Sequence, residues 1–116
     1  MGRQNVILEK SLAFSLVVVS FCEELYDKKR FIIANQLLKS GTSIGANIHE
    51  AQNIESRADF IHKLKIAGKE VDETKYWLLL CEKSEHYPSP GNLMSQIEEL
   101  SKILYKIISS SKSPLR

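Results

Sequence analysis

The sequence has few cysteines, no long apolar run and no recognisable secretory signal, and each point bears on where the protein works. Its two cysteines, Cys22 and Cys81, lie within apolar helical runs, so we expect buried free thiols in a reducing cytosol. The apolar run 12–22 is too short to cross a bilayer, and no cleavage-type segment follows the first residues. We therefore predict a cytoplasmic protein without a membrane role.

The sequence also lacks a large excess of either positive or negative charge. The 116 residues include 16 lysines and arginines against 14 aspartates and glutamates, which gives a formal net charge of +2. That excess is too small to identify a nucleic-acid-binding protein, and it does not exclude one. The one dense basic run is Lys28-Lys29-Arg30. Further basic residues are scattered along the second and third predicted helices: Lys39, Arg57, Lys63, Lys65 and Lys69.

Residue sets that carry catalysis or hold metals are absent as well. A di-iron bundle needs Glu-x-x-His twice and two further glutamates, whereas this sequence has one Asp59-x-x-His62, in which Asp59 is better explained as a helix cap. His49-Glu50 lacks the second histidine of a zinc-protease helix. No serine or cysteine has a recognisable base and orienting partner. We predict no catalytic, cofactor-binding or metal residues, no small-molecule substrate and no enzyme activity.

What the sequence does contain is an unusual helix over residues 30–53. Small and polar side chains repeat along it at steps of four and three, a spacing that apolar residues occupy in coiled coils: Gln36, Ser40, Ser43, Asn47 and Glu50. Gly41 and Gly45 cost a helix about 2 kcal/mol relative to alanine, so we expect another backbone to pack closely there. A phosphate loop is excluded, because the glycine-lysine-serine ending is missing and no strand precedes.

Three further amphipathic helices complete the predicted fold. The first covers residues 5–27, the third begins at the N-cap Ser56, and the fourth begins at the N-cap Ser89 with Pro90 as its first residue. Short connections make neighbouring helices antiparallel. The sequence thus predicts one all-α domain, an up-and-down antiparallel four-helix bundle over residues 1–108, followed by a flexible tail over residues 109–116.

We expect the polar residues of the second helix to face a polar stripe on the third. Glu70 and Glu73 lie between Ile66 and Trp77, and we expect them to accept hydrogen bonds from Asn47 and the serines. The predicted seam comprises Ser40, Ser43, Asn47, Glu50, Glu70 and Glu73. Two interpretations stay open: the seam fixes helix register and subunit packing, or it lines a pore or holds a ligand in an oligomer.

The first helix is apolar on two sides. One stripe consists of Phe14, Val18, Phe21 and Leu25, and a second, rotated from it, consists of Leu12, Leu16 and Val19. Only one side of a helix can face the core of a small bundle. We therefore predict that Leu12, Leu16 and Val19 form a subunit interface.

Two motifs resemble the family of four-helix-bundle proteins encoded in bacterial 23S rRNA intervening sequences. The first is Lys39-Ser40 followed by Ser43-Ile44-Gly45-Ala46-Asn47-Ile48 and Glu50, and the second contains Ser56-Arg57, Asp59-Phe60, Leu64, Ile66-Ala67, Glu70, Glu73 and Tyr76-Trp77-Leu78. The resemblance implies a left-handed bundle that assembles as a ring-like homopentamer, without a catalytic residue. The related accessory protein of diversity-generating retroelements has a similar bundle and binds nucleic acid and a reverse transcriptase.

The family's place in ribosomal RNA insertions suggests an RNA role by association. We expect a non-enzymatic homo-oligomer that binds structured RNA or an RNA–protein complex through basic residues repeated by symmetry: Lys28, Lys29, Arg30, Lys39 and Arg57. No aromatic stacking platform is evident, so binding should follow shape and charge. Two alternatives stay open: the basic residues form a solvated face, or the protein is an adaptor for a partner protein.

Overall fold

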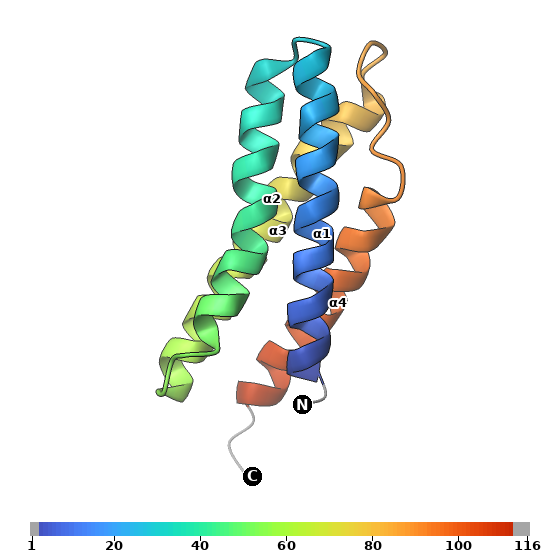
Figure 1. The fold of residues 1–116 in the computed structure, drawn as a ribbon. Coiled ribbons are helices and arrows are strands. Elements are labelled where there is room, and N and C mark those ends of the chain that lie inside the picture. Colours follow the sequence, from blue (N-terminus) through green and yellow to red (C-terminus); the bar gives the residue numbers. More distant parts are fainter. Residues whose placement is uncertain (1–2, 113–116) are drawn as a thin grey trace.

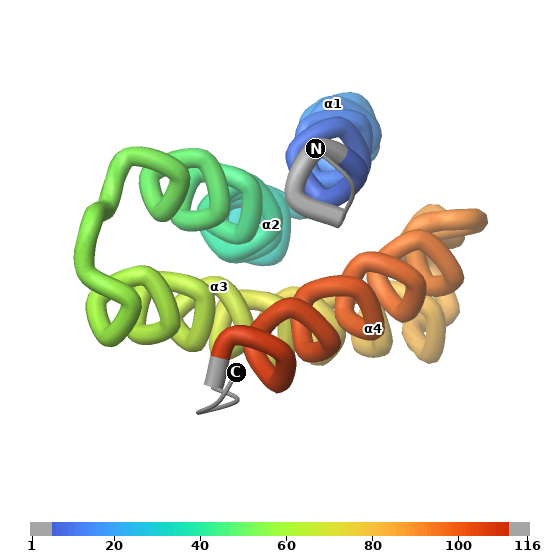
Figure 2. Tube along the Cα trace, turned by 90° about the horizontal axis from the view of Figure 1, so that it is seen from below, coloured from blue at the N-terminus to red at the C-terminus, as the bar shows by residue number. Residues whose placement is uncertain are grey.

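The computed structural model describes residues 3–112, which form α1 (Arg3–Asp27), α2 (Phe31–Ala51), α3 (Arg57–Lys83) and α4 (Leu93–Lys112). Helix α2 packs between α1 and α3, and α4 packs between α3 and α1. The four helices therefore surround one core, as the end view in Figure 2 shows. No strand occurs within residues 3–112, so the all-α prediction is confirmed for the described part of the chain.

The bundle is elongated, with extents of 51 × 21 × 20 Å, and its two ends carry different connections (Figure 1). One end has the turn 28–30 between α1 and α2 together with the connection 84–92 between α3 and α4. The other end has the connection 52–56 between α2 and α3 and the last turn of α4. The connections before and after α2 are therefore separated by the full length of that helix.

The core is filled by apolar side chains that recur on one face of each helix. Helix α1 contributes Phe14, Val18, Phe21 and Leu25, which are all buried, as the first predicted stripe requires. Burial of such side chains is the main favourable contribution to folding, at about 25 cal/mol per Å² of apolar area. The largest fully buried side chains of the other helices are Leu37, Ile44, Ile48, Leu64, Leu78, Leu93, Ile97, Leu100 and Leu104.

The two glycines of α2 lie against α1, which confirms their interpretation as a helix-packing pair. A Cβ atom added at Gly41 would lie 2.9 Å from Cγ1 of the buried Val18. One added at Gly45 would lie 3.3 Å from Ser15 Oγ and 3.4 Å from the backbone oxygen of Ser11. The absence of a side chain at these positions lets the backbones of α1 and α2 approach each other, which repays the low helix propensity of glycine.

The helix ends confirm one predicted cap and correct two boundaries. Ser56 Oγ accepts a hydrogen bond from Asp59 N at 3.2 Å and caps α3. The fourth helix begins at Leu93 rather than at Pro90, because Ser89 Oγ accepts from Gly91 N at 3.3 Å and Gly91 takes a left-handed φ of 58°. The predicted tail was placed too early, since residues 109–112 belong to α4; residues 113–116 lie outside the described part.

Candidate nucleic-acid interface

The basic run Lys28-Lys29-Arg30 forms the turn between α1 and α2. Arg30 N donates to Leu25 O at 2.8 Å and Lys29 N donates to Tyr26 O at 2.9 Å. These bonds define a Schellman motif, whose left-handed position usually holds glycine. Here that position is Lys29, with a φ of 63°. Lys28 and Lys29 are exposed, and neither forms an ion pair with another residue of the described chain.

Arg30 differs from the two lysines because the fold already uses its side chain. Its Nη2 donates to the backbone oxygen of His86 at 3.3 Å, and its guanidinium carbon lies 5.0 Å from the centroid of the Tyr87 ring. These contacts tie the α1–α2 turn to the connection 84–92. Arg30 adds positive charge to this end of the bundle, but fewer of its donors are available to a ligand.

The same end carries aromatic and apolar side chains that the sequence analysis overlooked. The rings of Tyr26 and Phe31 meet edge to face at a centroid distance of 5.1 Å, and Tyr26 Oη donates to Asn35 Oδ1 at 2.6 Å. Phe31 is 46% exposed and Ile32 is 78% exposed. A hollow of about 210 Å³ is lined by Lys29, Arg30, Phe31, Ile32 and Tyr87. A signal was present in the sequence, because Tyr26 and Phe31 flank the basic run.

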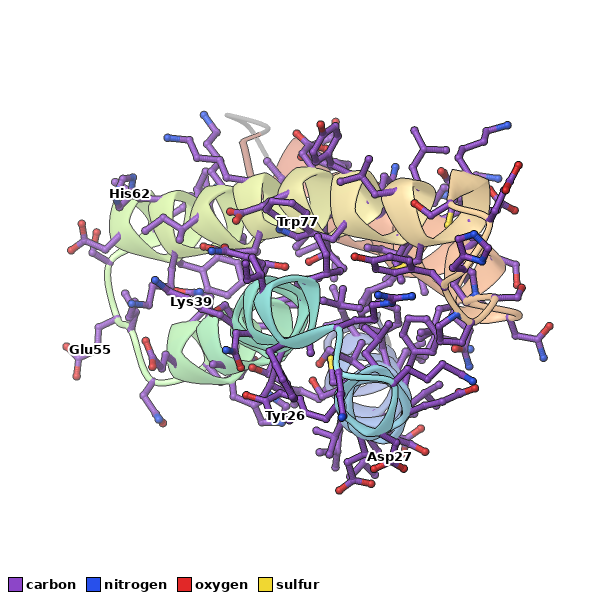
Figure 3. The ribbon with its side chains drawn as sticks, turned by 90° about the horizontal axis from the view of Figure 1, so that it is seen from above. Tyr26, Asp27, Lys39, Glu55, His62 and Trp77 are labelled. Carbon is purple, nitrogen blue, oxygen red and sulfur yellow. The ribbon has the colours of Figure 1, made fainter. Side chains whose placement is uncertain are left out.

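The other two basic residues of the predicted set lie elsewhere. Lys39 is in α2, and Figure 3 shows it between α2 and α3. Arg57 is the first residue of α3, at the opposite end of the bundle, where its Nη1 donates to Ser111 O at 3.3 Å. One chain therefore does not bring the five predicted residues into a single patch. It gathers Lys28, Lys29 and Arg30 only.

The polar seam holds α2 and α3 together at two points. Thr74 Oγ1 donates to Ser40 Oγ at 2.9 Å in the buried interior, and Lys63 Nζ pairs with Glu50 Oε1 at 2.7 Å near the surface. A buried polar pair is favourable only in the register that satisfies both hydroxyls. The interpretation of the seam as a register device thus has a physical basis at Ser40 and Thr74. The pore or ligand-ring alternative stays a prediction.

The expected donation from Asn47 and Ser43 to the glutamates of α3 is wrong. Asn47 Nδ2 donates to Ser43 O at 2.8 Å, and Ser43 Oγ donates to Lys39 O at 2.6 Å, so both side chains bond within their own helix. The carbonyl one turn back is close to such a side chain whatever the packing of the helix. Glu73 Oε2 instead accepts from Trp77 Nε1 at 3.3 Å.

Glu70 is left in an unfavourable electrostatic environment by this arrangement. Burial raises the pKa of its carboxyl group above the ordinary value, and the nearby charge of Glu73 raises it further. The positive charge of Lys39 acts in the opposite direction and lowers the pKa. Lys39 thereby has an identifiable role inside the chain, as a counter-charge on α2 for Glu70 of α3.

The second apolar stripe of α1 lies on the surface of the chain. Leu12, Leu16 and Val19 are 54%, 63% and 38% exposed. Next to Val19 a hollow of about 380 Å³ opens between α1 and α2, and it is also lined by Tyr26 and by Leu38 of α2. Contiguous exposed apolar side chains of this kind usually mark an interaction site.

The structure gives no support to nucleophilic chemistry at the cysteines. Cys22 and Cys81 are free thiols and both are buried. Burial raises the pKa of Cys22 to about 12 and that of Cys81 to about 11, so the reactive thiolate is scarce at neutral pH. Within the described residues, no three histidine, cysteine, aspartate or glutamate side chains gather as a metal site would require. No helix in that part of the chain is long and apolar enough to span a membrane.

Comparison with known proteins identifies a family and a solved structure that resemble this chain. The 23S rRNA-intervening sequence protein family matches residues 3–106. The chain is also similar to a protein of unknown function from the S23 ribosomal protein family of Bacteroides thetaiotaomicron, known from its crystal structure. The two are 42% identical, the alignment covers 92% of this chain and 98% of that chain, and the TM-score is 0.87. A comparison with curated proteins finds no match. The resemblance carried by the two sequence motifs is confirmed.

Proposed function

Because the chain belongs to the family of 23S rRNA-intervening sequence proteins, we propose that it is a non-enzymatic homo-oligomer that binds structured RNA, with ribosomal RNA as the first candidate. The observation that carries the proposal is the turn at one end of the bundle. Lys28 and Lys29 are exposed there and form no ion pair with the described residues. Free lysines are the groups that bind phosphates and release counterions.

Assembly is the second part of this proposal. One chain offers a small basic patch, and the acidic Asp27 and Glu85 lie near it in the fold. Repetition by symmetry turns a small patch into many simultaneous phosphate contacts, which raises affinity without any new contact type. The stripe Leu12, Leu16 and Val19 supplies an apolar surface for such self-association, and the family resemblance suggests five copies. The buried free thiols suit a reducing compartment, the cytoplasm.

A protein–protein adaptor is the alternative function, and the same apolar stripe favours it. In that case the stripe binds a different protein, and the lysines at the turn only keep the surface solvated. The two functions differ in what the purified protein does alone. An RNA-binding homo-oligomer assembles and binds RNA without help, whereas an adaptor needs its partner and binds RNA only through nonspecific charge.

The test measures binding to a structured ribosomal RNA fragment across a range of salt concentrations, with an unrelated RNA as competitor. Neutralising both lysines, as Lys28→Gln with Lys29→Gln, should weaken binding and lower the slope of log affinity against log salt by about 2 for each engaged subunit. Lys102→Gln with Lys106→Gln is the matched control, since both lysines are exposed on α4. Equal effects of the two double variants, or no binding by the wild type at physiological salt, would contradict the proposal.

A further inference from the structure

The hollow at the basic end of the bundle has an unusual composition. Phe31 and Ile32 line it from the first turn of α2, and Tyr87 lines it from the connection between α3 and α4. Ile32 has the largest exposed fraction of the described large apolar side chains, at 78%. Exposed apolar side chains at a helix terminus contribute nothing to the core of this chain. Their placement beside free lysines calls for a ligand that has both an apolar face and a negative charge.

The positive charge around the hollow comes from several independent groups. Lys29 and Arg30 line it directly, and Lys28 precedes them in the same turn. The N-terminus of α2 adds to this charge, because Arg30 as N-cap offers no side-chain hydrogen bond and the first turn contains no acidic residue. A left-handed backbone at Lys29 keeps this lysine at the rim, where glycine would be the sterically easier residue.

From this combination we propose that the hollow takes an unpaired nucleotide of RNA. Its base stacks against Phe31 and Ile32, and its phosphate lies against Lys28 and Lys29. Unpaired bases in loops and bulges are the parts of RNA that aromatic side chains can reach, whereas bases inside a duplex are covered by their neighbours. This inference rests on the proposed RNA binding and deepens it, because it names a loop or bulge, rather than a helix, as the feature that is recognised.

The inference is tested by measuring the affinity of the protein for two RNAs and the fluorescence of a base analogue in one of them. A hairpin with 2-aminopurine in its loop is compared with a fully paired duplex of the same length. The wild type should bind the hairpin more tightly and quench the 2-aminopurine fluorescence. Phe31→Leu keeps the apolar bulk and removes the ring, and it should weaken hairpin binding about tenfold, abolish the quenching and leave duplex binding unchanged. Tyr76→Leu, at an exposed ring on α3, is the matched control and should change nothing.

The outcomes distinguish a failure of the stacking site from a failure of RNA binding by the lysines of the turn. If the double lysine variant weakens both RNAs while Phe31→Leu changes neither affinity nor quenching, the stacking site is wrong and phosphate binding at the turn stands. If the double lysine variant changes neither RNA, both fail. A third result also overturns the inference: binding to vesicles that contain an anionic lipid, lost on Ile32→Ser, with no binding to either RNA. In that case the apolar tip inserts into a membrane surface.

Discussion

The outer faces of the two helical hairpins are built from different residues. The α1–α2 hairpin exposes leucine and valine side chains, namely Leu12, Leu16, Val19 and Leu38. The outer face of α3 exposes mainly polar and charged ones, such as His62, Lys65, Lys69 and Asp72, with Tyr76 and Leu79 as its large apolar exceptions. Water covers the second surface at no cost, but contact with water is unfavourable for the first. Folding of a single chain therefore leaves more apolar surface exposed on α1 than on α3.

The inner contacts of the two hairpins differ in a related way. Helices α1 and α2 meet at Gly41, where the neighbour is the buried and branched Val18. Helices α3 and α4 meet at Gly68, where the neighbour is the hydroxyl end of the partly exposed Tyr105. A branched side chain in a core has no free rotamer to move into, whereas an aromatic ring at the surface does. The α1–α2 contact is therefore the more rigid of the two.

The largest expected effect concerns assembly. Leu16→Lys places a charge in the exposed stripe of α1, and burying that charge between subunits costs several kcal/mol. The wild type should run as an oligomer on size-exclusion chromatography with light scattering, and the variant should shift to smaller species. Its circular dichroism spectrum should not change, because Leu16 is 63% exposed in the single chain.

Tyr76→Lys is the control for this experiment, since Tyr76 is an exposed apolar ring on α3, outside the stripe of α1. It should leave the assembly intact. A monomeric wild type would show that the α1 stripe does not mediate self-association, and dissociation by both variants would show that the two outer faces do not differ as described.

An effect of intermediate size should separate the two glycine contacts. Gly41→Ala gains about 1 kcal/mol of helix propensity, but its new Cβ overpacks Val18, which costs about 1–3 kcal/mol. We expect a net loss of about 1 kcal/mol in the free energy of unfolding, measured by urea denaturation. Gly68→Ala should be neutral or gain up to about 1 kcal/mol, because the Tyr105 hydroxyl, 2.5 Å from the new Cβ, can swing outward. Equal stabilisation by both substitutions would contradict a tight α1–α2 contact.

Helices and the apolar stripes were predictable because they depend on local signals. The cap at Ser56 and the four-three spacing of apolar residues are local in this sense. The start of α4 was not predictable, because two local hydrogen-bonding patterns compete at Ser89, and the turn to Gly91 N wins. The predicted partners of the seam were wrong for a similar reason, since Asn47 bonds to the carbonyl of Ser43 one turn back in its own helix.

The candidate site could be predicted in part. Three consecutive residues stay together in any fold, so Lys28, Lys29 and Arg30 form one patch. Arg57 follows a helix of 21 residues, about 30 Å long at 1.5 Å per residue, and must lie at the other end. That separation was available from the sequence. The approach of Tyr87 to Arg30 was not, because it depends on a contact between segments 56 residues apart, seen in the hydrogen bond to His86.

The smallest expected effect lies at the boundary between the two hairpins, where Glu70 of α3 faces α2. Burial and the charge of Glu73 raise its folded-state pKa, so its protonated form favours the folded state. The resulting stability is present below the unfolded pKa, near 4.5, and is lost as the pH rises through the folded value. Glu70→Gln should therefore stabilise the protein at pH 7, by about 0.5 kcal/mol or less, and the gain should vanish near pH 4.

Urea denaturation at the two pH values measures this difference, with Glu82→Gln, at an exposed position of the same helix, as the control. A gain that is the same at both pH values would mean that charge is not its cause. A loss at pH 7 would mean that the attraction between Glu70 and Lys39 outweighs burial and the repulsion from Glu73. An ion pair between Glu70 and Lys39 would then stabilise the contact between α2 and α3, in addition to the contacts of Ser40 with Thr74 and of Glu50 with Lys63.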